Sequence, residues 1–171
     1  MKTRQLVLDA MLAAVCFVLA NLALSTGTVK VTFESIPVLI GALLFGPIDG
    51  FAIGGIGTLL YQMLSYGFTA TTVLWIIPYM VCGLFVGLCA KFKNFTLSGW
   101  QLMAAVVLGE LLVTLLNTVA LYVDSRLYGY YYPTIITGVL AFRLVLCVVK
   151  AVVYSVVLPL VLKPVRRVLG R

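Results

Sequence analysis

Long runs of apolar residues, separated by short polar breaks or by Gly and Pro, dominate the chain. A helix needs about 20 predominantly apolar residues to cross the hydrocarbon core of a bilayer, so these runs predict membrane-spanning helices. The last run is too long for an upright span, and we expect it to tilt or to bend at Pro159. The spans predicted most readily are 6–24, 48–64, 72–90, 101–123 and 133–162.

The first run extends from Leu6 to about Leu24, which is longer than the apolar core of a secretory signal. No clear small-residue cleavage site follows it. We therefore interpret this run as the first span and not as a cleavable leader.

Basic residues decide whether the short apolar segment 33–45 also crosses the membrane. Loops that carry Lys and Arg stay in the cytoplasm, and such residues precede the first span, follow the span 72–90 at Lys91, and close the chain from Lys163. All three groups share one side only if 33–45 crosses. We therefore predict an all-α integral protein of the cell membrane: a compact bundle of six transmembrane helices, with both termini cytoplasmic and residues 1–171 forming a single membrane domain.

Composition supports a membrane protein and excludes several other classes. The chain is 63% hydrophobic and 10% charged, with a mean hydropathy of +1.18, whereas soluble domains carry about 25% charged residues. The net charge of +7 is concentrated at span ends, so we expect no nucleic-acid partner. There is no histidine and no CxxC pair among the four cysteines, so we expect neither a metal site, nor a cofactor, nor enzymatic activity.

Ionisable residues within predicted spans are candidates for function, because charge at membrane depth is costly. Glu110 and Arg143 fall at similar depth and could form a structural salt bridge. Alternatively, the planar guanidinium of Arg143 could bind an anionic group of a ligand. Lys150 lies two turns deeper, where we expect it to pair or to reach toward the inner face. Asn117 could hydrogen-bond either a neighbouring helix or a heteroaromatic ring.

Aromatic residues crowd the outer half of the predicted bundle. Many of them suit an interfacial belt, but Tyr and Trp also form the walls of pockets for flat organic ligands. The run 128–133 lies in an outer loop and could act as a lid. The predicted ligand-binding residues are Arg143, Asn117, Tyr61, Tyr66, Trp75, Tyr79, Tyr122, Tyr131 and Lys30.

Small residues recur at helical spacing, which allows close helix packing in lipid. The pairs are Gly50 with Gly54, Gly83 with Gly87, and Ala10 with Ala14. We expect the glycine pairs to pack within the bundle. The alanine face of the first span could instead dock a partner protein.

Several segments resemble the substrate-binding S components of energy-coupling factor (ECF) vitamin transporters. The similarity lies in Val31–Leu39, Leu44–Pro47 with Gly50, the Ala10/Ala14 face, Asn117-Thr118, and Arg143-Leu144 in the final span. The folate-type branch is the nearest. The resemblance implies an outward pocket closed by the loops after spans one, three and five. It also implies a membrane T component docked at Ala10 and Ala14, two ATPase subunits, and toppling of the whole S component during transport.

The expected function is therefore high-affinity binding of a water-soluble vitamin, of folate type, for an ATP-driven importer. No GxxxxGK[ST] motif is present, so the chain is not expected to hydrolyse ATP itself. Alternatives are an S component for another vitamin, such as riboflavin or pantothenate, and a self-sufficient secondary transporter that uses Glu110, Arg143 or Lys150. A membrane enzyme and a ligand-free scaffold are weaker alternatives.

Overall fold

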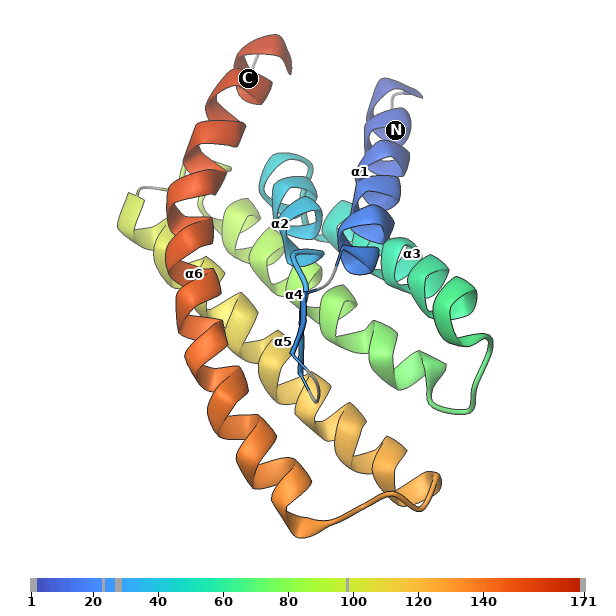
Figure 1. Cartoon of the computed structure of the whole chain (residues 1–171). Coiled ribbons are helices and arrows are strands. Elements are labelled where there is room, and N and C mark those ends of the chain that lie inside the picture. Colours follow the sequence, from blue (N-terminus) through green and yellow to red (C-terminus); the bar gives the residue numbers. More distant parts are fainter. Residues whose placement is uncertain (1–2, 23, 27–28, 98, 170–171) are drawn as a thin grey trace.

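A computed structural model of the protein describes residues 3–22, 24–26, 29–97 and 99–169. These residues form six helices, which confirms the predicted helical bundle, and one two-stranded hairpin (Figure 1). The elements are α1 (Thr3–Asn21), β1 (Leu24–Thr26), β2 (Val29–Val31), α2 (Ser35–Leu44), α3 (Pro47–Tyr66), α4 (Thr72–Phe92), α5 (Gly99–Leu127) and α6 (Pro133–Leu169).

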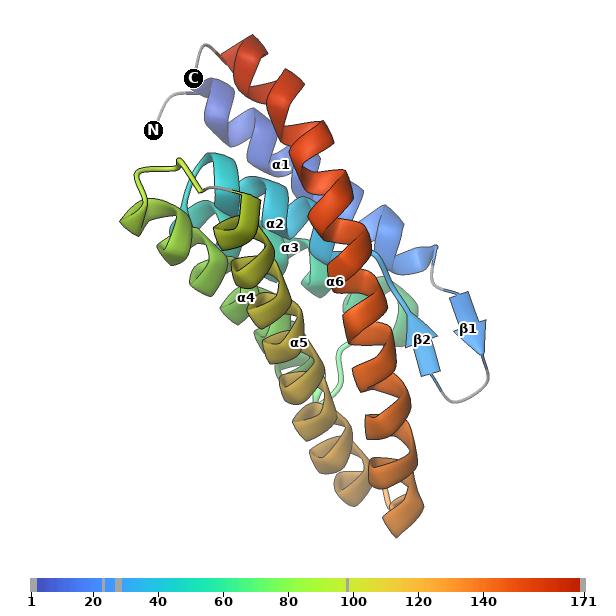
Figure 2. The same ribbon diagram turned by 90° about the vertical axis from the view of Figure 1, so that its left-hand side faces the viewer.

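Consecutive helices run in alternating directions along the bundle. As a result, the beginning of α1, the connection between α4 and α5, and the end of α6 all lie at one end (Figures 1 and 2). These are the regions that carry the basic clusters at the start of the chain, at Lys91 and from Lys163. The arrangement agrees with an even number of crossings. That this end faces the cytoplasm stays a prediction from the distribution of basic residues.

The connection between α1 and α2 contains the hairpin. Strand β1 pairs antiparallel with β2, with Leu24 opposite Val31 and Thr26 opposite Val29. β-branched residues favour extended backbone, and Thr26, Val29 and Val31 supply them. In Figure 2 the hairpin projects from the ends of α1 and α2 away from the chain termini.

The short helix α2 lies at the centre of the bundle. It contacts α1, α3, α4 and α6, and eight of its ten residues are buried. A helix that is apolar on every side is stable only when it is surrounded by protein or lipid. Its length is about 15 Å, half the thickness of the hydrocarbon core. The predicted span at 33–45 is therefore a half-length helix preceded by extended chain.

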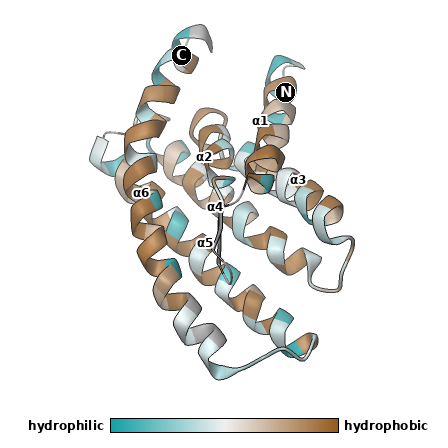
Figure 3. Ribbon diagram, viewed as in Figure 1, coloured by the Kyte–Doolittle hydropathy of each residue, from teal (hydrophilic) through white to brown (hydrophobic). Residues whose placement is uncertain are grey.

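The outer helices present apolar surfaces. Within the described residues, four helical segments are long and apolar enough to cross a membrane: Thr3–Asn21, Thr72–Phe92, Gly99–Leu127 and Leu140–Val165. Figure 3 shows hydrophobic residues along α1 and α6, with hydrophilic residues at their free ends. Helix α6 continues through Pro159 and Pro164 for 37 residues, about 55 Å at 1.5 Å per residue. This length requires tilting or projection beyond the bilayer.

Helices α3 and α4 approach each other closely at glycines. A Cβ atom added at Gly83 would lie 2.2 Å from the carbonyl oxygen of Gly50, and one added at Gly50 would lie 2.7 Å from the carbonyl oxygen of Gly83. A Cβ at Gly54 would meet the carbonyl oxygen of Tyr79 at 2.5 Å. Backbone contact of this kind leaves no room for any side chain. The glycine pairs predicted from their spacing therefore form the α3–α4 contact.

We expect Gly83→Ala to destabilise the protein, because the new methyl group has to displace backbone atoms of α3. Overpacking of this kind costs about 1–3 kcal/mol. The matched control is Gly138→Ala in α6, where an added Cβ meets nothing within 4 Å. Thermal unfolding in detergent should show a lower Tm for Gly83→Ala and an unchanged or slightly higher Tm for Gly138→Ala. Equal Tm values for the two variants would contradict the close packing.

Candidate ligand-binding site

A cavity with a volume of about 560 Å³ lies in the half of the bundle opposite the chain termini. This volume is within the range of about 300–1,000 Å³ that small-molecule sites occupy. The walls come from the second halves of α3 and α5, the first halves of α4 and α6, and the segments that precede α2, precede α4 and follow α5. The lining residues are Thr32, Glu34, Thr58, Tyr61, Gln62, Tyr66, Thr69, Thr71, Trp75, Tyr79, Val113, Thr114, Asn117, Leu121, Asp124, Tyr128, Arg143, Leu146, Cys147 and Lys150.

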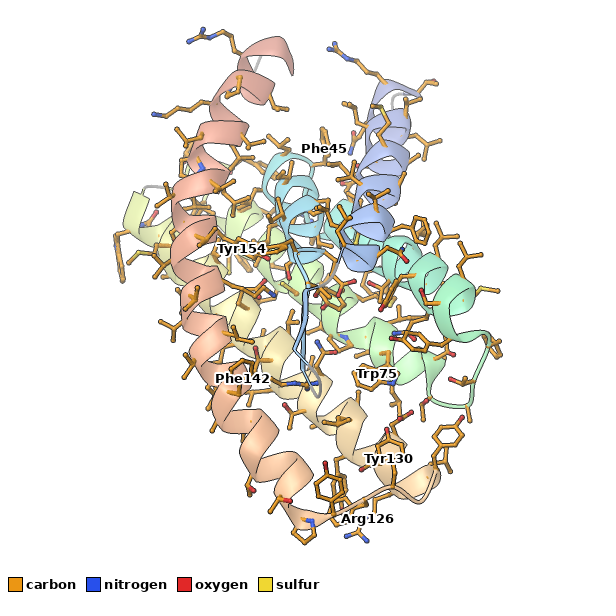
Figure 4. The ribbon with its side chains drawn as sticks, in the orientation of Figure 1. Phe45, Trp75, Arg126, Tyr130, Phe142 and Tyr154 are labelled. Carbon is orange, nitrogen blue, oxygen red and sulfur yellow. The ribbon has the colours of Figure 1, made fainter. Side chains whose placement is uncertain are left out.

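Aromatic side chains form one wall of the cavity. Tyr61, Tyr66, Trp75 and Tyr79 all line it, and Figure 4 shows Trp75 directed into the space between the helices. The Tyr61 and Tyr66 rings meet edge to face with centroids 5.9 Å apart, and their hydroxyl oxygens lie 3.3 Å apart. Such a wall offers stacking area together with hydroxyl groups. The structure thus brings together four of the six aromatic residues predicted for the site.

Lys150 and Glu110 form a buried ion pair between α6 and α5. The Lys150 Nζ lies 2.8 Å from Glu110 Oε2, and the Glu110 side chain is 1% exposed. A salt bridge between Glu110 and Arg143, one of the two sequence-based alternatives, does not form among the described residues: Glu110 Oε2 pairs with Lys150, and Glu110 Oε1 stays without a partner. Lys150 also lines the cavity, so it faces the site and does not extend toward the inner surface.

Arg143, in the cavity wall, has a buried nitrogen without a hydrogen-bond partner in the described part of the chain. Its Nη1 atom is buried and has no hydrogen-bond partner among the described residues. Asn117 lines the same cavity from α5. A buried guanidinium nitrogen without a hydrogen-bond partner is costly. An anionic group of a ligand would remove that cost through charge-assisted hydrogen bonds.

Glu34 is a cavity residue that sequence reasoning missed. It precedes α2, is 4% exposed, and its Oε1 accepts a hydrogen bond of 2.8 Å from the Thr32 hydroxyl. Its Oε2 has no partner among the described residues. In the sequence, Glu34 is a single acidic residue next to a short apolar segment. It can be recognised as a cavity residue only when α2 is known to start inside the bundle.

Hydrogen bonds at the cavity rim connect α4, α5 and the loop that follows α5. The Asp124 carboxylate accepts hydrogen bonds from Thr71 and Tyr130. Burial, followed by the hydrogen bond to Asp124, raises the pKa of Tyr130 to about 12, so its hydroxyl donates at neutral pH. Tyr128 from the same loop lines the cavity. The predicted lid segment thus lies at the mouth of the site.

Three predicted ligand-binding residues are not placed in the cavity wall. Tyr122 and Tyr131 pack edge to face with centroids 5.6 Å apart, and the Arg126 guanidinium lies 3.8 Å from the centroid of the Tyr131 ring. Figure 4 shows Arg126 at the end of the bundle opposite the termini. The side chain of Lys30 lies outside the described part of the chain.

Residues 4–162 match the family described as "ECF transporter, substrate-specific component". The chain belongs to this family. This S component is therefore a substrate-binding transporter subunit, not an enzyme, and a multi-pass protein of the cell membrane. Its fold is similar to a solved structure described as "Structure and mechanism of the S component of a bacterial ECF transporter", with a TM-score of 0.69 and 22% identity over 100% of both chains. A comparison with curated proteins gave no match.

We expect Glu110→Gln to destabilise the S component, because the change leaves Lys150 buried without its counterion. Removing one partner of a buried ion pair costs about 3–5 kcal/mol. The double variant Glu110→Gln/Lys150→Met removes both charges and should recover much of the loss. Thermal unfolding in detergent measures both effects. A single variant as stable as the unaltered protein would show that the pair is not buried as described.

Proposed function

We propose that this S component captures a water-soluble vitamin of the folate type, with high affinity, for an ATP-driven importer. The observation that carries the proposal is the cavity of about 560 Å³ with an aromatic wall and the unsatisfied Arg143 guanidinium. A flat heteroaromatic ring suits the aromatic wall. A carboxylate suits Arg143, since the guanidinium can form two parallel hydrogen bonds with it.

The proposal includes partner proteins that supply the energy. The sequence contains no phosphate-binding loop, so ATP hydrolysis would come from two ATPase subunits acting through a membrane T component. Ala10 and Ala14 are exposed on α1, and their small side chains would let a partner helix approach closely. Residues 1–171 would form the single membrane domain of this subunit, with both termini in the cytoplasm as the basic clusters favour.

Ligand identification is the first test of the proposed function. The protein is purified in detergent without added ligand, and co-purified small molecules are identified by mass spectrometry. We expect a vitamin at close to one molecule per chain. If none is found, thermal shifts with folic acid, riboflavin, pantothenate and thiamine follow, and folic acid should stabilise most. Absence of both a co-purified ligand and any stabilisation would overturn the proposal.

A variant on α1 separates docking from ligand binding. We expect Ala14→Trp to abolish ATP-dependent uptake into proteoliposomes that contain the T component and ATPases, because the bulky ring blocks close helix approach, while ligand affinity stays within about twofold. The matched control is Val148→Trp on α6, which also introduces a tryptophan at an exposed apolar position. The Val148 side chain is 64% exposed. The control should transport normally. Uptake by the S component alone would instead favour a self-sufficient transporter.

A further inference from the structure

The cavity contains buried polar atoms that nothing in the described protein satisfies. Among the lining residues, such atoms are Arg143 Nη1, Glu34 Oε2 and Thr58 Oγ1. Buried polar groups are almost always hydrogen-bonded, and each unpaired one costs about 1–3 kcal/mol, more when it is charged. Three unpaired atoms around one cavity therefore indicate the polar groups that a bound molecule has to supply.

The other charged residues of the wall already have partners. Lys150 pairs with Glu110, and Asp124 accepts hydrogen bonds from Thr71 and Tyr130. One cation and one carboxylate, Arg143 and Glu34, are left to meet a ligand.

A hydrogen bond from Thr32 holds the Glu34 carboxylate in position in the cavity wall. Thr32 donates to Oε1 at 2.8 Å, and the Tyr79 hydroxyl lies 3.4 Å from the Thr32 hydroxyl oxygen. The backbone carbonyl of Glu34 lies 3.4 Å from the Cys16 sulfur, so α1 also contacts this position. With Oε1 engaged, Oε2 is the oxygen that remains available. When ionised, a carboxylate is an acceptor only, so a hydrogen-bond donor is the partner that would stabilise this charge.

We propose that Glu34 is a second ligand anchor and that the substrate is an amphoteric molecule. It presents an amino group or ring N–H to Glu34 and an anionic group, carboxylate or phosphate, to Arg143. This inference rests on the proposed vitamin-binding function and narrows its substrate class. An aminopyrimidine-type ring with a carboxylate side chain has both features. A compound without a donor leaves Glu34 buried and unpaired, and a site built to hydrogen-bond its substrate strongly rejects such an analogue.

Matched ligands and matched variants test the assignment. Folic acid is compared with 2-desaminofolic acid, which lacks the ring amino group, by isothermal titration calorimetry on the detergent-purified full chain. We expect the unaltered protein to bind the desamino compound roughly 10- to 100-fold more weakly. In Glu34→Gln, binding of folic acid should weaken by at least about tenfold. The ratio of the Kd for the desamino compound to the Kd for folic acid should fall toward one. A purely structural role for Glu34 would weaken both compounds equally and leave their ratio unchanged.

Asp49→Asn in α3 is the control, because it makes the same chemical change in a buried carboxylate outside the cavity wall, which accepts a hydrogen bond from Gln5. The ratio of the two Kd values in this variant should match the ratio in the unaltered protein. Equal binding of both compounds by the unaltered protein would overturn the role of Glu34 while the vitamin-binding function stands. Preference for a vitamin without an anionic group would overturn the amphoteric substrate, because nothing would then pair with Arg143. If no vitamin binds and no small molecule co-purifies, the proposed function itself fails.

Discussion

The burial of α2 is the constraint on which the site depends. This ten-residue helix is apolar throughout and is enclosed by α1, α3, α4 and α6. It spans only about half of the hydrocarbon core, and its first residue, Ser35, and the preceding Glu34 are buried, so it begins inside the bundle. The chain that leads into it, with Thr32 and Glu34, therefore contributes polar groups to the cavity wall. A full-length helix would have carried these groups to the membrane surface.

The balance of charge follows from the same geometry. A bundle surrounded by lipid cannot rely on water to solvate its interior charges, so each needs a protein or ligand partner. Lys150 pairs with Glu110 Oε2 at 2.8 Å, although Glu110 Oε1 stays without a partner among the described residues, and Asp124 accepts hydrogen bonds within the protein. Arg143 and Glu34 each keep an unpaired buried atom. Incomplete pairing destabilises the empty cavity and thereby favours a molecule that supplies the missing groups.

Much of the fold was predictable because hydrophobic length and basic residues report directly on membrane crossing. The helices at 72–92 and 47–66 begin within a residue of the predicted spans, since Thr71, Thr72 and Pro47 mark helix starts. The hairpin was missed because three-residue strands leave almost no periodic signal. Residue type and depth were enough to predict the site residues Tyr61, Trp75, Tyr79 and Arg143. The pairing of Glu110 with Lys150 depends on how α5 and α6 are oriented about their axes, and sequence spacing alone does not give that orientation.

The position of Trp75 has a spectroscopic consequence. The chain contains two tryptophans: Trp75 lines the cavity, whereas Trp100 is 72% exposed at the start of α5. Indole emission depends on the polarity around the ring, so the two residues report on different places. Replacing Trp100 by Phe leaves one tryptophan, located in the wall of the site. The intrinsic fluorescence of that protein becomes a label-free optical signal of cavity occupancy, including during transport in a lipid membrane.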